Sequence, residues 1–368
     1  MTLTETIISL DPSAFRDGER VLVQHGRLAA SGFLFSSGVC GVRLKNELGN
    51  VILLPFQGQQ VWSAEFGGRN LAMRSLFTEP RPVHEFLENF GGLLLHCGAT
   101  AMGSPSKEDT HPLHGELPNA PYSTAFLAIG EDERGEYIGL GGEYVHIVAF
   151  GSCYSARPSL RLHGGSSLLA MSMTISNLRN SPMELMYLAH INFRPVDDGR
   201  LVYSAPCDPE HIHVRSSLPG FIQPRAGYLE FIEELKHHPE KHNVLRAELI
   251  FDPEVVFGIR YLADAQGWAH CMQVHPDGSA DYVRHRPDQL DHGIRWISRT
   301  ADQDALGFEP ATAEVEGYLA EKRKGNIKVL PPKGQFHCNV EFGALSPREV
   351  KDVEARIEEA LSRSTRSA

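Results

Sequence analysis

The feature that most constrains the fold of this chain is a long succession of short apolar runs separated by Gly, Asn, Ser and Pro. From about residue 18 to residue 77 the runs are VLVQ, SGFLF, VCGVRL, NVILLP, VWSAEF and LAMRSLF. Runs of this length with turn residues between them are typical of consecutive β-strands. Similar runs fill the middle of the chain and return after residue 246, with β-branched and aromatic residues alternating with small or polar ones. The sequence therefore predicts a mainly β fold.

The order of these runs favours two packed antiparallel sheets. A parallel α/β sheet would need helices alternating regularly with the strands, and that alternation is missing. Sandwiches often exceed two hundred residues as one unit, so the 368 residues do not force a division. We expect a large antiparallel β-sandwich that forms a single domain over residues 1–368, with a few peripheral helices. Such a sandwich can hold a ligand in the concave face of one sheet.

Three segments depart from the strand pattern. VHEFLENFG, after about residue 82, is expected to form a helix or a lid, and a polar loop follows it. Residues 207–245 are rich in His and Pro and contain the short helical piece YLEFIEELKHH, so they predict an excursion from the sheets. Residues 347–363 carry a Ser cap, a Pro in the first turn and apolar residues at helical spacing, which predicts one terminal amphipathic helix.

Charge and hydropathy exclude several classes of partner. The formal net charge is −11 and there is no long basic stripe, so nucleic acid is not an expected partner and a neutral ligand fits better. The N-terminal residues lack a basic start, and no run of about eighteen apolar residues occurs, so neither secretion nor a membrane span is expected. Six cysteines without a C-x-x-C pair are expected to be reduced thiols, which makes the cytoplasm the default location. A homodimer is left open.

His114 and His190 are the histidines whose surroundings point most clearly to a site. His114 lies in THPLHGELP, where Pro112 and Gly115 predict a short turn on which the ring is fixed. His190 lies in MELMYLAHINF, two residues before Asn192. Side chains two residues apart on a strand point to the same face, so His190 and Asn192 could contact one ligand. The alternatives are a surface-loop His114 and a buried His190 whose ring is bonded to a backbone carbonyl.

Two carboxylates are candidates for acid/base chemistry. Glu341 in FHCNVEFGAL and Glu309 in ALGFEPAT each follow apolar residues near the end of a strand. Such a carboxylate is either exposed on an outer face or desolvated, and desolvation raises its pKa toward the range that a general base needs. Arg74 could bind hydroxyl groups through its planar set of donors, or it could pair with a nearby acid on the surface.

A metal site is the competing interpretation of the loop around His114. His111, His114 and Glu116 are imidazole and carboxylate ligands of the kind that zinc, manganese or iron accept. Their spacing matches no established ligand motif.

Taken in order, these segments resemble the aldose 1-epimerase (galactose mutarotase-like) superfamily, in a divergent and poorly characterised branch of it. The resemblance is carried by RNLAMRSLF, LHGELPNAPY, SMTISNLRNSPMELMYLAHINF, LGFEPAT and FHCNVEFGAL, which span about residues 70–345. It implies the galactose mutarotase-like sandwich, a sugar substrate and no cofactor. It also implies that His190 is the general acid, Glu341 the general base and His114 a group that holds the sugar ring. Beside these, we expect Arg74, Asn192, Glu309 and His111 to be further substrate contacts.

The sequence also departs from the pattern of the superfamily. The Asp-His pair that usually precedes the final strands has only Asp291 and His292 as a counterpart, in surroundings that do not align, and Glu309 could replace that acidic contact. Three functions therefore remain open: an aldose mutarotase or epimerase, a metal-dependent sugar isomerase or lyase using His111, His114 and Glu116, and a non-catalytic sugar-binding protein. The sequence does not identify the sugar.

Overall fold

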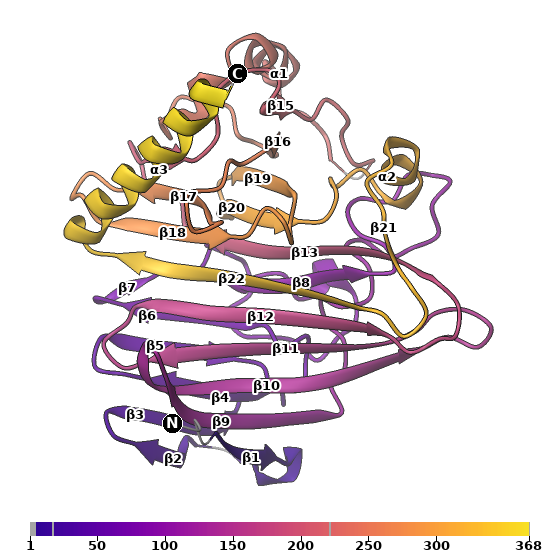
Figure 1. Ribbon diagram of the computed structural model, residues 1–368, viewed down its shortest axis with the longest axis vertical. Helices are drawn as coiled ribbons and strands as arrows, with labels where there is room; N and C mark the ends of the chain where they lie inside the picture. The colour runs from indigo at the N-terminus through magenta and orange to yellow at the C-terminus, as the bar shows by residue number, and fades with distance from the viewer. Residues whose placement is uncertain (1–4, 17, 221, 368) are drawn as a thin grey trace.

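Two large antiparallel sheets packed face to face make up most of the molecule, as expected from the sequence. The computed structural model describes residues 5–16, 18–220 and 222–367. Figure 1 shows the strands of one sheet in front, with those of the other behind them. Among the described residues, no helix is long and apolar enough to cross a membrane.

The front sheet has nine strands, and neighbours in its order are hydrogen-bonded. In spatial order they are β1 (Thr6–Leu10), β9 (Thr124–Asp132), β10 (Gly135–Ile147), β11 (Cys153–His163), β12 (Leu168–Asn177), β22 (Gln335–Leu345), β18 (Ala280–His285), β17 (Ala269–Val274) and β14 (Arg200–Tyr203).

The second sheet has thirteen strands. Eleven lie in the order β15 (Ile212–Val214), β16 (Val255–Ile259), β19 (His292–Arg299), β20 (Asp304–Ala311), β13 (Met183–Phe193), β8 (Leu94–Ala99), β6 (Val61–Phe66), β5 (Gly49–Leu53), β4 (Cys40–Lys45), β3 (Leu28–Leu34) and β2 (Arg20–His25). The short strands β21 (Lys328–Leu330) and β7 (Arg69–Asn70) pair with β13 and β6.

Strand β12 shows why these sequences form a sandwich. Leu169, Met171, Met173 and Ile175 are buried in the main core, while the residues that alternate with them, Ala170, Ser172 and Thr174, are half-buried. Because successive side chains on a strand point to opposite faces, this alternation turns one face toward the second sheet and the other toward solvent.

Strand β13 is instead buried along almost its whole length. Its odd-numbered residues, such as Ala189 and Ile191, join the main core between the sheets. Its even-numbered residues therefore lie on the outer face of the thirteen-stranded sheet, where Met186 and Leu188 belong to a second apolar cluster. This covered outer face is where the candidate site is found.

Helices are few and peripheral, as expected. The α-helices are α1 (Tyr228–His237), α2 (Tyr318–Lys324) and α3 (Pro347–Ser367), and single turns of 3-10 helix occur at Pro12–Ala14, Phe86–Glu88 and Pro239–Asn243. The predicted terminal helix is confirmed as α3, with Ser346 and Glu349 exchanging capping hydrogen bonds. Its apolar residues Val350, Val353 and Ile357 join a cluster on the nine-stranded sheet. The VHEFLENFG segment forms only the 3-10 turn Phe86–Glu88, and α2 was not predicted.

Candidate active site

His190 and Glu309 lie opposite each other on neighbouring strands. Strands β13 and β20 pair Leu188 with Ala311 and Asn192 with Gly307, so the residues midway between these pairs face each other on the same side of the sheet. The Nδ1 atom of His190 is 3.2 Å from Oε1 of Glu309. Both side chains are almost fully buried.

Asn192 fixes the orientation of the His190 ring. Nδ1 of His190 lies 2.6 Å from Oδ1 of Asn192, whose Nδ2 donates to the carbonyl of Gly92 at 3.2 Å. Because the amide group uses its NH2 toward Gly92, its oxygen must accept from the imidazole, which places the proton of the neutral ring on Nδ1. Nε2 then carries the lone pair and is the ring nitrogen left for a substrate. The expectation that His190 and Asn192 share one face is confirmed.

Burial favours the neutral form of both members of the pair. Burial lowers the pKa of His190 to about 4. Burial also raises the pKa of Glu309 well above its ordinary value, and the Glu254 carboxylate adds to this, while Arg215 opposes it. Oε1 of Glu309 is buried without a hydrogen-bond partner, since the nearby Nδ1–H is directed at Asn192. A lowered pKa for the imidazole and a raised pKa for the carboxyl favour a pair whose exchangeable proton is on Glu309.

Gly307 makes room for the carboxyl group. A Cβ atom at this position would lie 2.1 Å from Oε1 of Glu309 and 3.1 Å from Cβ of Trp296. Any larger residue would therefore displace Glu309, because real Cβ atoms do not approach oxygen so closely.

His114 completes a group of rings around His190. The two imidazole rings are 5.1 Å apart and nearly perpendicular, and the ring of Phe86 lies 4.8 Å from that of His114. The backbone of His114 has φ of 59°, a left-handed conformation held by hydrogen bonds to Gly98 and Gly103. Burial lowers the pKa of His114 well below its ordinary value, and its Nδ1 has no partner. His114 therefore presents a neutral imidazole with unused hydrogen-bonding capacity.

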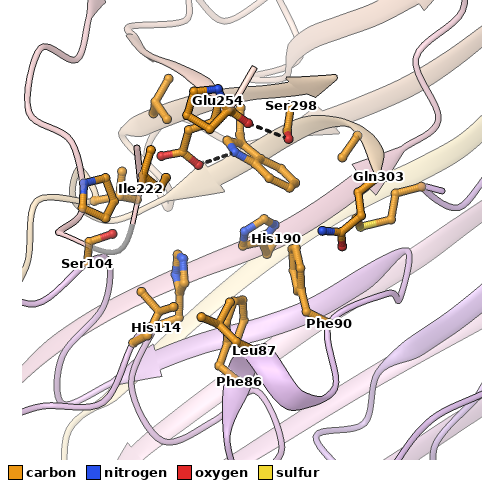
Figure 2. A pocket seen from close by; sticks show the side chains of 18 of the residues that line it. Phe86, Leu87, Phe90, Ser104, His114, His190, Ile222, Glu254, Ser298 and Gln303 are labelled. Carbon is orange, nitrogen blue, oxygen red and sulfur yellow. Dashed lines mark hydrogen bonds between the residues drawn. The ribbon is translucent and has the colours of Figure 1, made fainter. Parts of the chain in front are cut away.

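Phe86, His114, His190 and Glu309 line one cavity of about 470 Å³. Figure 2 shows His114 and His190 pointing into the same space, with Phe86 and Phe90 on one side and Glu254 on the other. Its remaining lining is mostly apolar, with Ser104, Ser298, Thr300 and Gln303 among the polar members. A mainly apolar pocket with a few converging polar groups is the usual form of a small-molecule site.

The wall above His190 is built on Trp296. Its ring lies 5.6 Å from the His190 ring at 81°, and its Nε1 donates to Oε2 of Glu254 at 2.7 Å. The other oxygen of Glu254 is paired with Arg215. Arg215 is the only Lys or Arg among the lining residues that the structure describes, and its charge is already balanced. The cavity therefore suits a neutral ligand better than an anionic one.

Comparison with known proteins agrees with this architecture. The model of a family described as a domain of unknown function (DUF4432) matches residues 36–210, which include His114 and His190. No curated protein matches the sequence. A candidate aldose 1-epimerase from Klebsiella pneumoniae has a solved structure that superposes with a TM-score of 0.81 at 17% identity, covering 98% of this chain and 96% of that one. The chain has the galactose mutarotase-like fold.

Two further solved structures share this mutarotase-like fold less closely. A candidate mutarotase from Salmonella typhimurium gives a TM-score of 0.57 at 11% identity, covering 89% of this chain and 97% of that one. A galactose mutarotase-like protein from Clostridium acetobutylicum gives 0.57 at 12% identity, covering 87% and 99%. At such low identities the likeness establishes the fold and leaves the activity to be argued from the site.

Glu341 is not brought to the cavity. It lies on β22, where its neighbours Val340 and Phe342 face the core between the sheets. Glu341 therefore points out of the opposite side of the sandwich from His190. Its Oε1 accepts from Arg134 at 2.7 Å, and its Oε2 accepts from Arg284 at 2.7 and 3.0 Å. Glu341 is therefore not placed to act as a general base beside His190, and the carboxyl group in that position belongs to Glu309.

Arg74 and His111 are also outside the cavity lining. The exposed Arg74 donates to the carbonyls of Thr300 and Ala301 and so holds the loop that borders the cavity. His111 uses both ring nitrogens locally, with Nδ1 bonded to the carbonyl of Pro112 and Nε2 accepting from the backbone N–H of Tyr318. Neither residue is placed to contact a ligand beside His190.

The proposed metal ligands do not converge. Glu116 accepts from Thr100 and from the Tyr154 hydroxyl, while the nitrogens of His111 are engaged elsewhere. In the part of the chain that the structure describes, the only His, Cys, Asp or Glu group close enough to share an ion is Glu314, Glu316 and Glu321, and Lys324 already binds all three. The side chains of His111, His114 and Glu116 are therefore not arranged to bind one metal ion, and the alternative of a metal site on these residues is wrong.

Asp291 and His292 bond to each other at the start of β19, with Asp291 also paired to Lys328, and neither lines the cavity. Glu309, rather than Asp291, is the acidic residue beside His190.

The wall residues Phe86, Phe90, Arg215, Glu254 and Trp296 were not predicted. Only the two Phe residues of VHEFLENFG lie in a segment that the sequence singled out, as a helix or a lid.

Proposed function

We propose that this protein catalyses the interconversion of the anomers of a neutral aldose by acid/base ring opening. The observation that carries the proposal is the buried pair of His190 and Glu309, whose side chains approach to 3.2 Å at the wall of a cavity sized for a small ligand. Opening a hemiacetal needs one group that donates a proton and one that accepts a proton on the same substrate.

In this proposal the two roles are divided between His190 and Glu309 as follows. Nε2 of His190 accepts the proton of the anomeric hydroxyl, and Glu309 donates its proton to the ring oxygen as the bond between that oxygen and the anomeric carbon breaks. The open-chain aldehyde rotates about its bond to the neighbouring carbon. Ring closure on the other face returns both protons, so the pair ends as it began. This assignment reverses the acid role expected for His190, because a pKa of about 4 leaves the ring without a second proton at neutral pH.

The other cavity residues position the sugar in this account. His114 offers a neutral imidazole with an unpartnered Nδ1 to a hydroxyl group. The rings of Phe90 and Trp296, 5.7 Å apart, form an apolar wall for the face of the sugar ring. The paired Arg215 and Glu254 place no free charge against it. No cofactor or metal takes part in these steps.

The test follows α and β anomers of a panel of neutral aldoses by NMR saturation transfer with the purified protein. We expect at least one aldose to interconvert faster than in buffer, and His190→Asn to remove about 10²- to 10⁴-fold of that acceleration. An aldose that binds, as shown by calorimetry, without any acceleration would instead favour the non-catalytic sugar-binding protein. Wild-type rates equal to buffer for all sugars, with no binding, would contradict the proposal.

A further inference from the structure

A second cavity adjoins the first on the same face of the sheet. It has a volume of about 420 Å³ and shares Arg215, Val256, Ile294 and Val315 with the cavity at His190. Because four residues from four separate segments line both spaces, the two cavities are neighbours across a common boundary.

Strand register shows how the two cavities are joined along the floor. Glu309 pairs with Ile294 on β19, and Ile294 pairs with Gly258 on β16. A row on one face of the sheet therefore crosses four adjacent strands, and its members are in order His190, Glu309, Ile294 and Gly258. Three strand spacings make this row about 14 Å long. A ligand whose reactive end lies at His190 therefore has a continuous floor leading into the second cavity.

Gly258 makes room for the His213 ring at the floor of the second cavity. It has no side chain, and a Cβ atom there would lie 2.4 Å from the His213 ring. His213 comes from β15 at the edge of the sheet, where its Nε2 is 2.9 Å from Oε1 of Glu314. The ring thus covers the floor at the outer end of the row.

The second cavity differs from the first in its chemistry. Its members that do not line the first cavity include Ser216, Ser217, His213, Glu314 and Glu316, which offer hydroxyl, imidazole and carboxylate groups. The carboxylates disfavour an anionic group, and the Lys324 amine is bound to both of them, within 2.6 Å. Neutral hydroxyl groups suit such a lining, since they can donate to carboxylates and accept from the serines.

We infer that the substrate of this site is a sugar of at least two units, with its reducing unit at His190 and Glu309 and the next unit in the second cavity. The inference rests on the proposed function for the orientation of the substrate. The apolar walls around His190 hold the ring that opens, and the hydroxyl-rich unit beyond Arg215 supplies binding energy away from the reacting atoms.

The experiment compares binding of glucose with binding of maltose, cellobiose and lactose by calorimetry, using the full chain. We expect at least one disaccharide to bind about tenfold tighter than glucose or more, which corresponds to about 1.4 kcal/mol. The variant His213→Trp fills the outer cavity and should reduce this preference to about twofold or less. The matched control is His237→Trp on α1, where the side chain is 72% exposed and lines neither cavity.

If His213→Trp fails to fold, Ser216→Trp blocks the same space from the loop that follows β15. Wild-type protein that binds no disaccharide more tightly than glucose, or a preference that survives both blocking variants, would overturn the inference. Calorimetry separates this outcome from failure of the proposed function, because a preference in binding without anomerisation retains the second subsite and rejects only the catalysis.

Discussion

The imidazole Nδ1 of His190 and the amide oxygen of Asn192 are 2.6 Å apart, within a buried strand and on the face that carries Glu309. A neutral partner at this distance orients the ring without adding charge. The pKa of His190 can therefore stay at about 4 despite the hydrogen bond, because burial is the larger cause. The contact between these two residues fixes which ring nitrogen of His190 carries the proton, and the proposed mechanism depends on that.

Replacing that neutral partner with a charged one should move the pH profile. In Asn192→Asp, the new carboxylate would stabilise the imidazolium form and raise the pKa of His190 by about 1–3 units. A protonated ring cannot accept a proton, so the rate should begin to fall at a correspondingly higher pH as the solution is acidified. The measurement is the pH dependence of kcat, with Asn339→Asp on the other sheet as control. An unchanged acid limb would show that His190 is not the acceptor.

Gly307→Ala should disturb Glu309 without altering any catalytic side chain. The added methyl group would lie 2.1 Å from the Glu309 carboxyl oxygen. We expect about a 10²-fold loss of kcat, the scale for a misplaced reacting group, and a loss of about 1–3 kcal/mol in the free energy of unfolding. Gly164→Ala is the matched control, because its nearest neighbour is 3.9 Å away. Full activity in Gly307→Ala would contradict the account of how Glu309 is positioned.

Buried neutral histidines should make the fold sensitive to acid. Burial lowers the pKa of His96, His242 and His285 to about 3, from an ordinary value of 6.5. Below pH 6.5 the unfolded chain binds protons that the folded chain does not. The free energy of unfolding therefore decreases as the pH is lowered from 6.5 to about 3. Each such histidine contributes about 1.4 kcal/mol for every pH unit in this window.

The measurement is urea unfolding at pH 7 and pH 4.5 for wild type and for His96→Gln. Removing one buried histidine should make the free energy of unfolding decrease less between pH 7 and pH 4.5. His237→Gln, at an exposed position, should leave the decline unchanged. Equal slopes for wild type and His96→Gln would show that His96 is not held neutral.

Strand patterning in the sequence was enough to predict the sandwich, the terminal helix and the shared face of His190 and Asn192. Each of these depends on periodicity within one segment. The choice between Glu309 and Glu341 could not be made this way, since both carboxylates follow apolar strand residues. That choice depends on sheet order: β20 lies beside β13, whereas β22 lies between β12 and β18 in the other sheet.

The hydrogen-bond partners of Glu341 likewise could not be predicted from patterns within one segment of the sequence. Arg284 faces it across the β18–β22 pair, and Arg134 is 207 positions away in the sequence. The walls of the cavity likewise come from separate loops that carry Phe86, Arg215 and Glu254. Contacts over such sequence distances follow from the three-dimensional packing of the strands, and one sequence alone does not reveal them.

The contacts of Glu341 with Arg134 and Arg284 should stabilise the fold. In Glu341→Gln both arginines lose a charged acceptor, and we expect the free energy of unfolding to fall by about 1–3 kcal/mol. Thermal and urea unfolding measure this loss. Unchanged stability would contradict a structural role for the three residues.

The central claim is that Glu309, and not Glu341, exchanges a proton with the sugar beside His190. It is tested most directly by saturation transfer between anomers of the best aldose with wild type, Glu309→Gln and Glu341→Gln at equal concentrations of folded protein. The account predicts a loss of about 10²- to 10⁴-fold for Glu309→Gln and a rate close to wild type for Glu341→Gln. A wild-type rate for Glu309→Gln together with a comparable loss for Glu341→Gln would contradict it.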